Sequence, residues 1–344
     1  MPADPELRPL TPPAVVASTA ATELFGTRFP VVAGGLQFLA DADYAAACAR
    51  AGIIGFLTSN HLPDDAALRS EIRKARDLCG DLPFGVNIAM LPKSAEHERI
   101  ERIVDVVAEE GVRFVETTGR SPEPYLPVLK AAGAKVLHKV PGLKYAEKAQ
   151  SVGVDMVTIV GWECGGHPGP NAIGSIVNAA LAHERLRIPY LIGGGIGHGS
   201  QILAALAMGA SGVLMGTRFL ASAEIPAHDG YKAALCAATE NDTTISLWSV
   251  RNDARTLANE TTRIVAELER ADPDAGIGPL LPHVSGAVAR QTYADGNASR
   301  GMVYAGQALG FVSRPQTVAE IVEQLIAEFA AARARLGACL DARS

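Results

Sequence analysis

One unit repeats along the chain from residue 29 to residue 219: a short apolar run, a turn rich in glycine or polar residues, and an amphipathic stretch rich in alanine and leucine. The apolar runs that we predict to be strands are residues 30–33, 53–57, 84–88, 114–116, 135–138, 156–160, 190–192 and 212–215. Several are continuously apolar, which is typical of parallel strands covered on both faces. Eight successive strand–helix units predict an α/β protein whose strands close into a (β/α)8 barrel, a TIM barrel. An open doubly wound sheet is the alternative.

Amphipathic stretches between these strands are the predicted helices. They are residues 43–51, 64–78, 95–110, 123–132, 143–152, 173–184 and 200–208. Asp41, Asp64 and Ser200 are predicted N-caps, because a short polar side chain at that position accepts a hydrogen bond from the first helical turn. The glycines that follow helix ends, where a left-handed backbone is common, are those at positions 52, 111, 133, 153 and 209.

The pattern changes after residue 219. Residues 225–270 have a helical pattern, residues 280–310 are irregular and rich in Gly, Ser and Arg, and residues 318–336 predict a long alanine-rich helix. We therefore expect three parts. They are an N-terminal leader (1–21), a barrel (22–224 plus 311–340), and a small helical or irregular second domain (225–310) that covers the C-terminal face of the barrel. Such a cover excludes water from a ligand bound below it.

Charge and cysteine content limit the partners of this chain. The net charge is −6 with no block of like charges, so we expect neither nucleic acid nor an anionic membrane as a partner. Five scattered cysteines, with no Cys-x-x-Cys pair, argue against a disulfide framework and fit a reducing cytoplasm. The histidines show no spacing typical of metal ligands, so no metal is expected. Residues 1–13 lack the pattern of a signal peptide, and no apolar run is long enough to cross a bilayer.

His167 is the candidate catalytic residue. It lies in Gly-Trp-Glu-Cys-Gly-Gly-His-Pro-Gly at residues 161–169, directly after the predicted strand at 156–160. A ligand can approach it closely because the neighbouring glycines carry no side chains. An imidazole titrates near neutral pH and suits proton transfer. We predict that His167 transfers a proton; a turn histidine bound to backbone groups is the alternative. Cys164 has no adjacent basic partner and is predicted to pack rather than react.

Two glycine-rich turns follow the last two predicted strands, Gly-Gly-Gly-Ile-Gly at 193–197 and Met-Gly-Thr at 215–217. In a barrel, such turns lie at the C-terminal face and hold phosphate with backbone N–H groups. They predict a phosphate-bearing ligand. Lys139 ends the fifth predicted strand and is a predicted ligand contact, whereas His138 points to the opposite side of that strand and is predicted to be structural. His198 is predicted to be a solvated loop residue.

Three motifs together resemble the nitronate monooxygenase family, formerly called 2-nitropropane dioxygenases. They are the nine residues at 161–169, Gly-Gly-Gly-Ile-Gly-His-Gly at 193–199, and Gly-Ala-Ser-Gly-Val-Leu-Met-Gly-Thr-Arg-Phe-Leu at 209–220. Further matches at 34–37, 83–87, 138–139 and 305–307 extend the resemblance over roughly residues 22–335. The resemblance implies an FMN-binding (β/α)8 barrel with a helical second domain. The flavin contacts that it implies are Gly34, Gln37, Asn87, Lys139, Gly165, Gly166, Gly194, Gly195, Gly216 and Thr217, with the phosphate at the last four.

The resemblance leaves the reaction open. In the first interpretation, the enzyme oxidises a nitronate or nitroalkane with O2 to a carbonyl compound and nitrite, with His167 as the base. Cys164 stands where better-characterised nitronate oxidisers have alanine, and Pro168 follows the histidine. This combination resembles a branch that includes FMN-dependent NADH:quinone reductases, so NAD(P)H as co-substrate and a quinone as substrate form the second interpretation. Enoyl-thioester reductases share the barrel, and a non-catalytic phosphate-ligand-binding barrel is a further alternative. A homodimer is left open.

Overall fold

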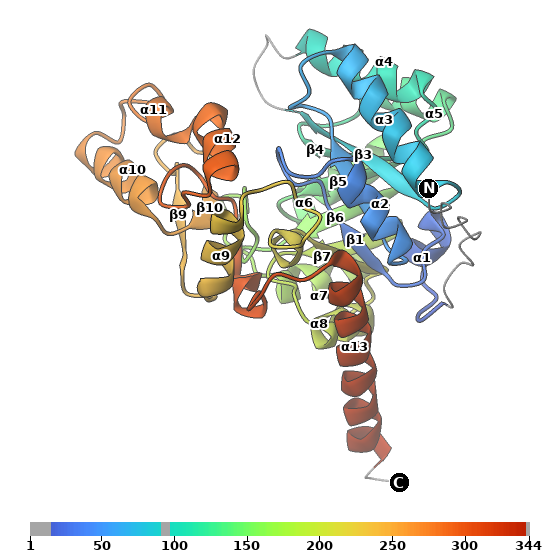
Figure 1. Ribbon diagram of the computed structural model, residues 1–344. Helices are drawn as coiled ribbons and strands as arrows, with labels where there is room; N and C mark the ends of the chain where they lie inside the picture. The colour runs from blue at the N-terminus through green and yellow to red at the C-terminus, as the bar shows by residue number, and fades with distance from the viewer. Residues whose placement is uncertain (1–14, 91–96, 342–344) are drawn as a thin grey trace, which may run out of the picture.

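The computed structural model describes residues 15–90 and 97–341 (Figure 1). Eight parallel strands follow chain order around a closed barrel, and β1 pairs with β8 to complete it. The strands are β1 (Val31–Ala33), β2 (Ile54–Thr58), β3 (Phe84–Met90), β4 (Phe114–Gly119), β5 (Lys135–Val140), β6 (Met156–Val160), β7 (Tyr190–Gly193) and β8 (Gly212–Met215). The predicted (β/α)8 barrel is confirmed. Of the predicted leader, residues 1–14 lie outside the described residues.

Helices alternate with the strands along the chain. They are α1 (Ala20–Phe25), α2 (Ala42–Arg50), α3 (Asp65–Cys79), α4 (His97–Glu109), α5 (Leu126–Ala131), α6 (Leu143–Val152), α7 (Ser175–Arg185) and α8 (Gly199–Ala207). The predicted N-caps Asp41 and Asp64 are confirmed, because their carboxylates accept from Tyr44 N–H at 2.9 Å and Ala67 N–H at 2.8 Å. The five glycines predicted to end helices all have positive φ. Residues 95 and 96, where one predicted helix begins, lie outside the described residues.

The predicted N-cap at Ser200 is wrong, because His198 caps α8. Its imidazole Nδ1 accepts a hydrogen bond from Ser200 N–H at 3.1 Å, and the Gln201 side chain accepts from His198 N–H at 3.1 Å. The acceptor nitrogen of the imidazole therefore takes the place of the Ser, Thr, Asn or Asp oxygen that usually caps a helix. His198 also lies 3.6 Å from the Glu328 carboxylate, so it is a structural residue rather than a solvated loop residue.

Apolar side chains fill the N-terminal half of the barrel interior. They are Phe25 of α1 together with Val32, Ile54, Phe56, Phe114, Leu137, Met156, Leu191 and Leu214 of the strands. The Phe25 ring meets Phe114 edge to face with ring centroids 5.2 Å apart. Because Phe114 begins β4, α1 closes the N-terminal end of the barrel. The interior is therefore a packed core, and the opposite, C-terminal end is left for a ligand.

The chain after β8 forms further elements beside the barrel (Figure 1). They are η2 (Thr217–Phe219), α9 (Asp229–Ala237), β9 (Thr243–Ser246), β10 (Ala254–Leu257), α10 (Glu260–Ala271), α11 (Leu281–Val284), α12 (Gly286–Asp295), η3 (Gln307–Phe311) and α13 (Val318–Asp341). Two predictions are wrong here. Residues 225–270 include an antiparallel hairpin of β9 and β10, and residues 280–310 include two short helices. The β-branched residues of β9 favour a strand, and their sheet partner stabilises it.

Candidate active site at the C-terminal end of the barrel

A buried carboxylate joins three other positions at the C-terminal side of the barrel. Glu116 of β4 is fully buried. Its Oε2 accepts hydrogen bonds from Asn87 Nδ2 of β3 and from Gly35 N–H at 3.2 Å, in the loop after β1. Its Oε1 lies 3.3 Å from Lys139 Nζ of β5. Charge pairing with Lys139 offsets the cost of burying the Glu116 charge. The structure therefore brings Asn87 and Lys139 together, as the sequence predicted for residues of one ligand face.

Sequence reasoning missed Glu116 itself. A signal was present, since Glu116 is the acidic residue at the end of an otherwise apolar predicted strand. Acidic residues are almost never fully buried unless they are paired. Within the described residues, Glu116 Oε1 has no hydrogen-bond donor beyond its ion pair with Lys139. That oxygen remains an acceptor for a ligand that binds beside Lys139.

The loop after β1 contributes backbone rather than side chains to this region. Gly34 N–H donates to Met215 O of β8 at 3.2 Å. A Cβ on Gly34 would come within 3.2 Å of Leu214, so a side chain here would crowd the barrel. Gln37 lies in the same loop with its side chain exposed. The next residue, Phe38, has φ +66°, a backbone conformation that is uncommon outside glycine and often found near functional sites.

The His167 loop is attached to the hairpin. Gly166 N–H donates to Arg255 O at 3.0 Å, and Arg255 N–H donates to Gly166 O at 2.7 Å. The Arg255 side chain adds a hydrogen bond from Nε to Trp162 O at 3.2 Å and lies over the Trp162 ring. These contacts fix the backbone on both sides of Cys164 and end one residue before His167. The segment that carries the candidate base is thus held by residues distant in sequence.

His167 keeps part of its surface exposed to solvent although protein atoms surround most of its ring, which lies 5.8 Å from the Tyr304 ring. Desolvation by the surrounding protein lowers the pKa of His167, and the nearby charge of Asp253 raises it by a smaller amount. The imidazole is consequently neutral at neutral pH and able to accept a proton. A general base must be accessible to its substrate and unprotonated at the pH of the reaction, and His167 meets both conditions.

Two other titratable groups, Cys164 and His138, are not reactive at neutral pH. Burial raises the pKa of the Cys164 thiol to about 12, so the thiol is protonated and unreactive at neutral pH. Burial lowers the pKa of His138 to about 4, and its Nδ1 lies 2.8 Å from Thr117 Oγ1. Cys164 packs in the loop and His138 packs in the barrel wall, in agreement with the interpretation of the sequence.

The glycine-rich turns after β7 and β8 lie next to each other, because Gly193 pairs with Leu214 at the ends of these strands. Gly194 and Gly195 have φ +98° and +71°, which glycine adopts without strain. In the described residues 15–90 and 97–341, no hydrogen bond engages the backbone N–H of Gly195 or of Gly216. Unpaired N–H groups in adjacent glycine turns match the needs of a phosphate. Thr217 Oγ1 accepts a hydrogen bond from Gly306 N–H at 2.9 Å.

Gly165 lies in close contact with another loop, and Gly166 takes part in backbone hydrogen bonds. A Cβ on Gly165 would lie 2.7 Å from Gly306 N, so only glycine lets the two loops meet there. The N–H of Gly166 is used by Arg255, and Gln307 N–H donates to Glu163 O at 3.0 Å. Hence these two glycines connect the His167 loop to the later part of the chain. Direct contact between them and a flavin stays a prediction.

In the described part of the chain, no three His, Cys, Asp or Glu side chains form a group that could hold a metal ion. None of its helices combines the length and apolarity that crossing a bilayer requires.

Comparison with known proteins assigns this barrel to a class. The family model of nitronate monooxygenase matches residues 18–328. The chain therefore belongs to the nitronate monooxygenase family, whose members are flavin-dependent oxidoreductases.

Among curated relatives, the chain is 37% identical over 228 residues to a Rhodococcus jostii (strain RHA1) protein named (3aS,4S,5R,7aS)-5-hydroxy-7a-methyl-1-oxo-octahydro-1H-indene-4-carboxyl-CoA dehydrogenase. That match spans 66% of this chain and 62% of the relative.

Solved structures show the same architecture. FabK from Thermotoga maritima superposes with a TM-score of 0.85 at 29% identity, covering 94% of this chain and 99% of FabK. Nitroalkane oxidase from Streptomyces ansochromogenes superposes with a TM-score of 0.76 at 26% identity, covering 92% of this chain and 99% of that protein.

Proposed function

We propose that this protein is an FMN-dependent oxidoreductase of nitronate monooxygenase type, which oxidises nitronates or nitroalkanes with O2 to a carbonyl compound and nitrite. The observation that carries the proposal is the state of His167. It is exposed to solvent, its pKa is lowered by desolvation, and its loop is bound on one side by Arg255. A neutral, accessible and positioned imidazole suits removal of a proton from a carbon acid.

The residues at the C-terminal face fit FMN. Asn87, Glu116 and Lys139 offer an amide, a carboxylate and an ammonium group, which suit the polar edge of a flavin ring. The free N–H groups of Gly195 and Gly216 suit its phosphate. The remaining proposed contacts are Gly34, Gln37, Gly165, Gly166, Gly194 and Thr217. Bound flavin supplies the electron acceptance that no amino-acid side chain provides.

His167 performs the proton step. With a neutral nitroalkane, the C–H bond next to the nitro group breaks, the proton moves to the imidazole, and the electron pair passes into the nitro group to form a nitronate. With a nitronate as substrate, that proton is already absent, and His167 orients the anion instead. Tyr304, whose ring lies 5.8 Å from the His167 ring, shields the imidazole from water on one side.

A CoA thioester is the second candidate substrate. Its support is the 37% identity to the Rhodococcus jostii protein, whose name describes a carboxyl-CoA dehydrogenase. A thioester, like a nitro group, acidifies the neighbouring C–H bond, so the same base serves both reactions. NAD(P)H with a quinone is the remaining alternative.

One anaerobic experiment separates these functions. The purified yellow protein is mixed in turn with propionate-3-nitronate, a saturated acyl-CoA, NADH and NADPH, and the flavin absorbance band is followed. Bleaching by nitronate, and nitrite release once O2 is admitted, is the expected result. Bleaching by the acyl-CoA alone favours the second candidate. Rapid bleaching by NAD(P)H with no nitrite from nitronate overturns the proposal. Release of FAD rather than FMN from the denatured protein overturns the cofactor assignment.

A further inference from the structure

Ser175 connects the first turn of α7 to the turn after β7. It is the first residue of α7 and is buried. Its Oγ lies within hydrogen-bonding distance of three oxygen atoms: Gly194 O at 2.7 Å, Gly193 O at 3.0 Å and Glu163 Oε2 at 3.0 Å. A serine hydroxyl has one proton to donate, so these three acceptors compete for it.

The other donors in this region decide the competition. The Glu163 carboxylate already accepts from Ser175 N–H at 3.0 and 3.1 Å, at the positive end of α7. Gly193 O already accepts from Gly161 N–H at 2.9 Å. Among the hydrogen bonds of the described residues, Gly194 O has no donor other than Ser175. The hydroxyl proton therefore goes to Gly194 O, which also gives the shortest of the three distances.

That hydrogen bond sets the direction of the next N–H group. In a planar trans peptide, the C=O of one residue and the N–H of the next point in opposite directions. Because Gly194 C=O points to Ser175, the Gly195 N–H points away from α7. Glycines on both sides of this peptide allow it to rotate readily, so an external contact is needed to hold it. Glu163 fixes Ser175 in turn through its backbone N–H.

We propose that Ser175, supported by Glu163, is a positioning residue that aims the Gly195 N–H at the phosphate of FMN. The inference rests on the proposed function, since it requires FMN. It adds two side chains that do not touch the cofactor but keep an anion-binding N–H group in its binding orientation. Preorganised donors bind an anion more tightly than donors that must first be ordered.

The test compares FMN with riboflavin, which has the same ring and no phosphate. Apoprotein is titrated with each flavin and the quenching of flavin fluorescence gives Kd. For Ser175→Ala we expect the Kd of FMN to rise about tenfold, the effect of losing one hydrogen bond. The Kd of riboflavin should stay within about twofold. Glu163→Ala should resemble Ser175→Ala, whereas Glu163→Gln keeps an acceptor for Ser175 N–H and should stay near wild type. Ile176→Ala, the neighbouring exposed position on α7, is the matched control.

Several results overturn the inference. Unchanged FMN affinity in Ser175→Ala does so, and so does an equal loss for FMN and riboflavin, which indicates general damage to the site. If Ser175→Ala lowers the melting temperature strongly, Ser175→Cys retains a weaker donor and must show an FMN-selective loss of intermediate size. A wild-type protein that binds neither flavin refutes the proposed function itself, an outcome distinct from a wild type that binds FMN with unaffected variants.

Discussion

Gly166 and Arg255 exchange two backbone hydrogen bonds, from Gly166 N–H to Arg255 O at 3.0 Å and from Arg255 N–H to Gly166 O at 2.7 Å. Gly166 immediately precedes His167, and Arg255 lies in β10. The hairpin therefore continues the loop that carries the candidate base, and the position of His167 depends on a strand that follows the barrel in sequence. The buried Arg255 side chain strengthens this connection through Trp162 O and Thr243 Oγ1.

Arg255→Met should loosen the His167 loop while leaving the backbone bridge in place. The variant loses the hydrogen bonds to Trp162 O and Thr243 Oγ1, at 3.2 and 3.0 Å. We expect kcat to fall about tenfold, since small displacements of a catalytic group are costly, with flavin content unchanged. Steady-state kinetics and the absorbance ratio of flavin to protein measure both quantities. Arg263→Met, at an exposed arginine of α10, is the control. Full activity in Arg255→Met would show that the backbone bridge alone is sufficient.

His167→Ala should retain the yellow colour and lose most turnover. Removing a general base typically costs between about 10² and 10⁴ in rate. No flavin-binding group is lost, because the loop is held by Gly166 and Glu163 rather than by the imidazole. The measurement is turnover with each candidate substrate, alongside the flavin content of the variant. A decrease smaller than about threefold with every substrate would make His167 a structural residue.

The pH dependence of the reaction should report the environment of His167. A base acts when unprotonated, so kcat/KM should fall as the pH drops through the pKa of His167. Desolvation lowers that pKa, which places the fall below the ordinary value of 6.5. Asp253 raises the pKa, so Asp253→Asn should move the fall to still lower pH. Asp274→Asn, at an exposed position, should leave the profile unchanged. A shift to higher pH in Asp253→Asn would contradict this assignment.

Gly195→Asp should prevent flavin retention. The position has φ +71°, and a Cβ there would lie 2.8 Å from Glu163 Cβ. The new carboxylate would also repel both Glu163 and a phosphate. Purified protein should be colourless and should remain so after incubation with FMN. Gly133→Asp is the matched control, because Gly133 also has positive φ, at +81°, with no atom within 4 Å of an added Cβ. Yellow Gly195→Asp protein would place the phosphate elsewhere.

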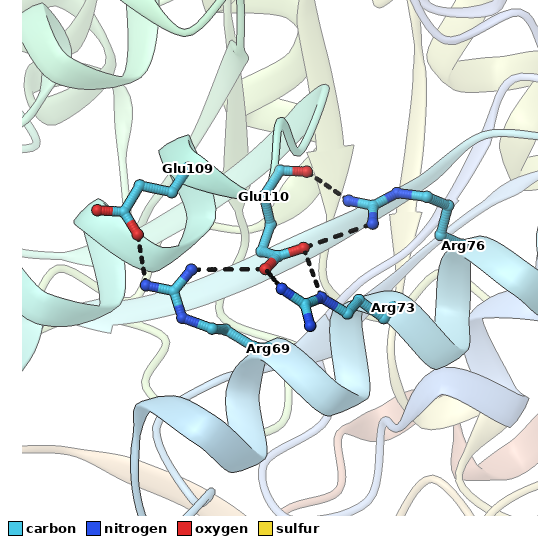
Figure 2. Close-up of polar contacts among 5 residues, drawn as sticks. All are labelled: Arg69, Arg73, Arg76, Glu109 and Glu110. Carbon is cyan, nitrogen blue, oxygen red and sulfur yellow. Dashed lines mark hydrogen bonds and ion pairs between the residues drawn. The ribbon is translucent and has the colours of Figure 1, made fainter.

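Glu110 joins α3 to the end of α4 on the outside of the barrel, where Arg69, Arg73 and Arg76 surround its carboxylate (Figure 2). The hydrogen bond from Arg73 contributes most to lowering the pKa of Glu110, against a smaller opposing effect of desolvation. A depressed carboxyl pKa stabilises the fold above the ordinary value of 4.5, and this stability is lost as the pH falls through the folded-state pKa.

Glu110→Gln should therefore lower the melting temperature by roughly 2–4 °C at pH 7, a modest loss because solvent screens these charges. The difference from wild type should shrink as the pH drops below 4.5. Calorimetry at several pH values checks both statements, with Glu267→Gln, from an exposed ion pair on α10, as the control. A pH-independent difference would point to packing rather than charge.

Local sequence patterns predicted the barrel because each unit carries its own signals. An apolar run specifies a strand buried on both faces, and Asp41 and Asp64 mark helix starts with side chains that act on the next turn. The hairpin of β9 and β10 was not predicted, because it lacks such local signals. The two strands at 243–246 and 254–257 are short, and a seven-residue connection without a tight-turn sequence separates them. Their pairing is stabilised by contacts across the hairpin, which no local window contains.

The residues of the candidate site likewise fall into those that the sequence predicted and those that only the fold brings together. The sequence by itself determined where glycine permits a left-handed turn, as at Gly194 and Gly195, and where a titratable His167 follows a strand, because backbone freedom and side-chain chemistry belong to single residues. Only the tertiary structure decided that Glu116 lies between Asn87 and Lys139. The same holds for the contacts of Arg255 with the His167 loop and for the hydrogen bond from Ser175 to the Gly194 carbonyl. These partners come from separate strands, helices and loops. A hydrogen bond forms only when donor and acceptor are brought within about 3 Å in a suitable direction, and the folding of the whole barrel sets that distance.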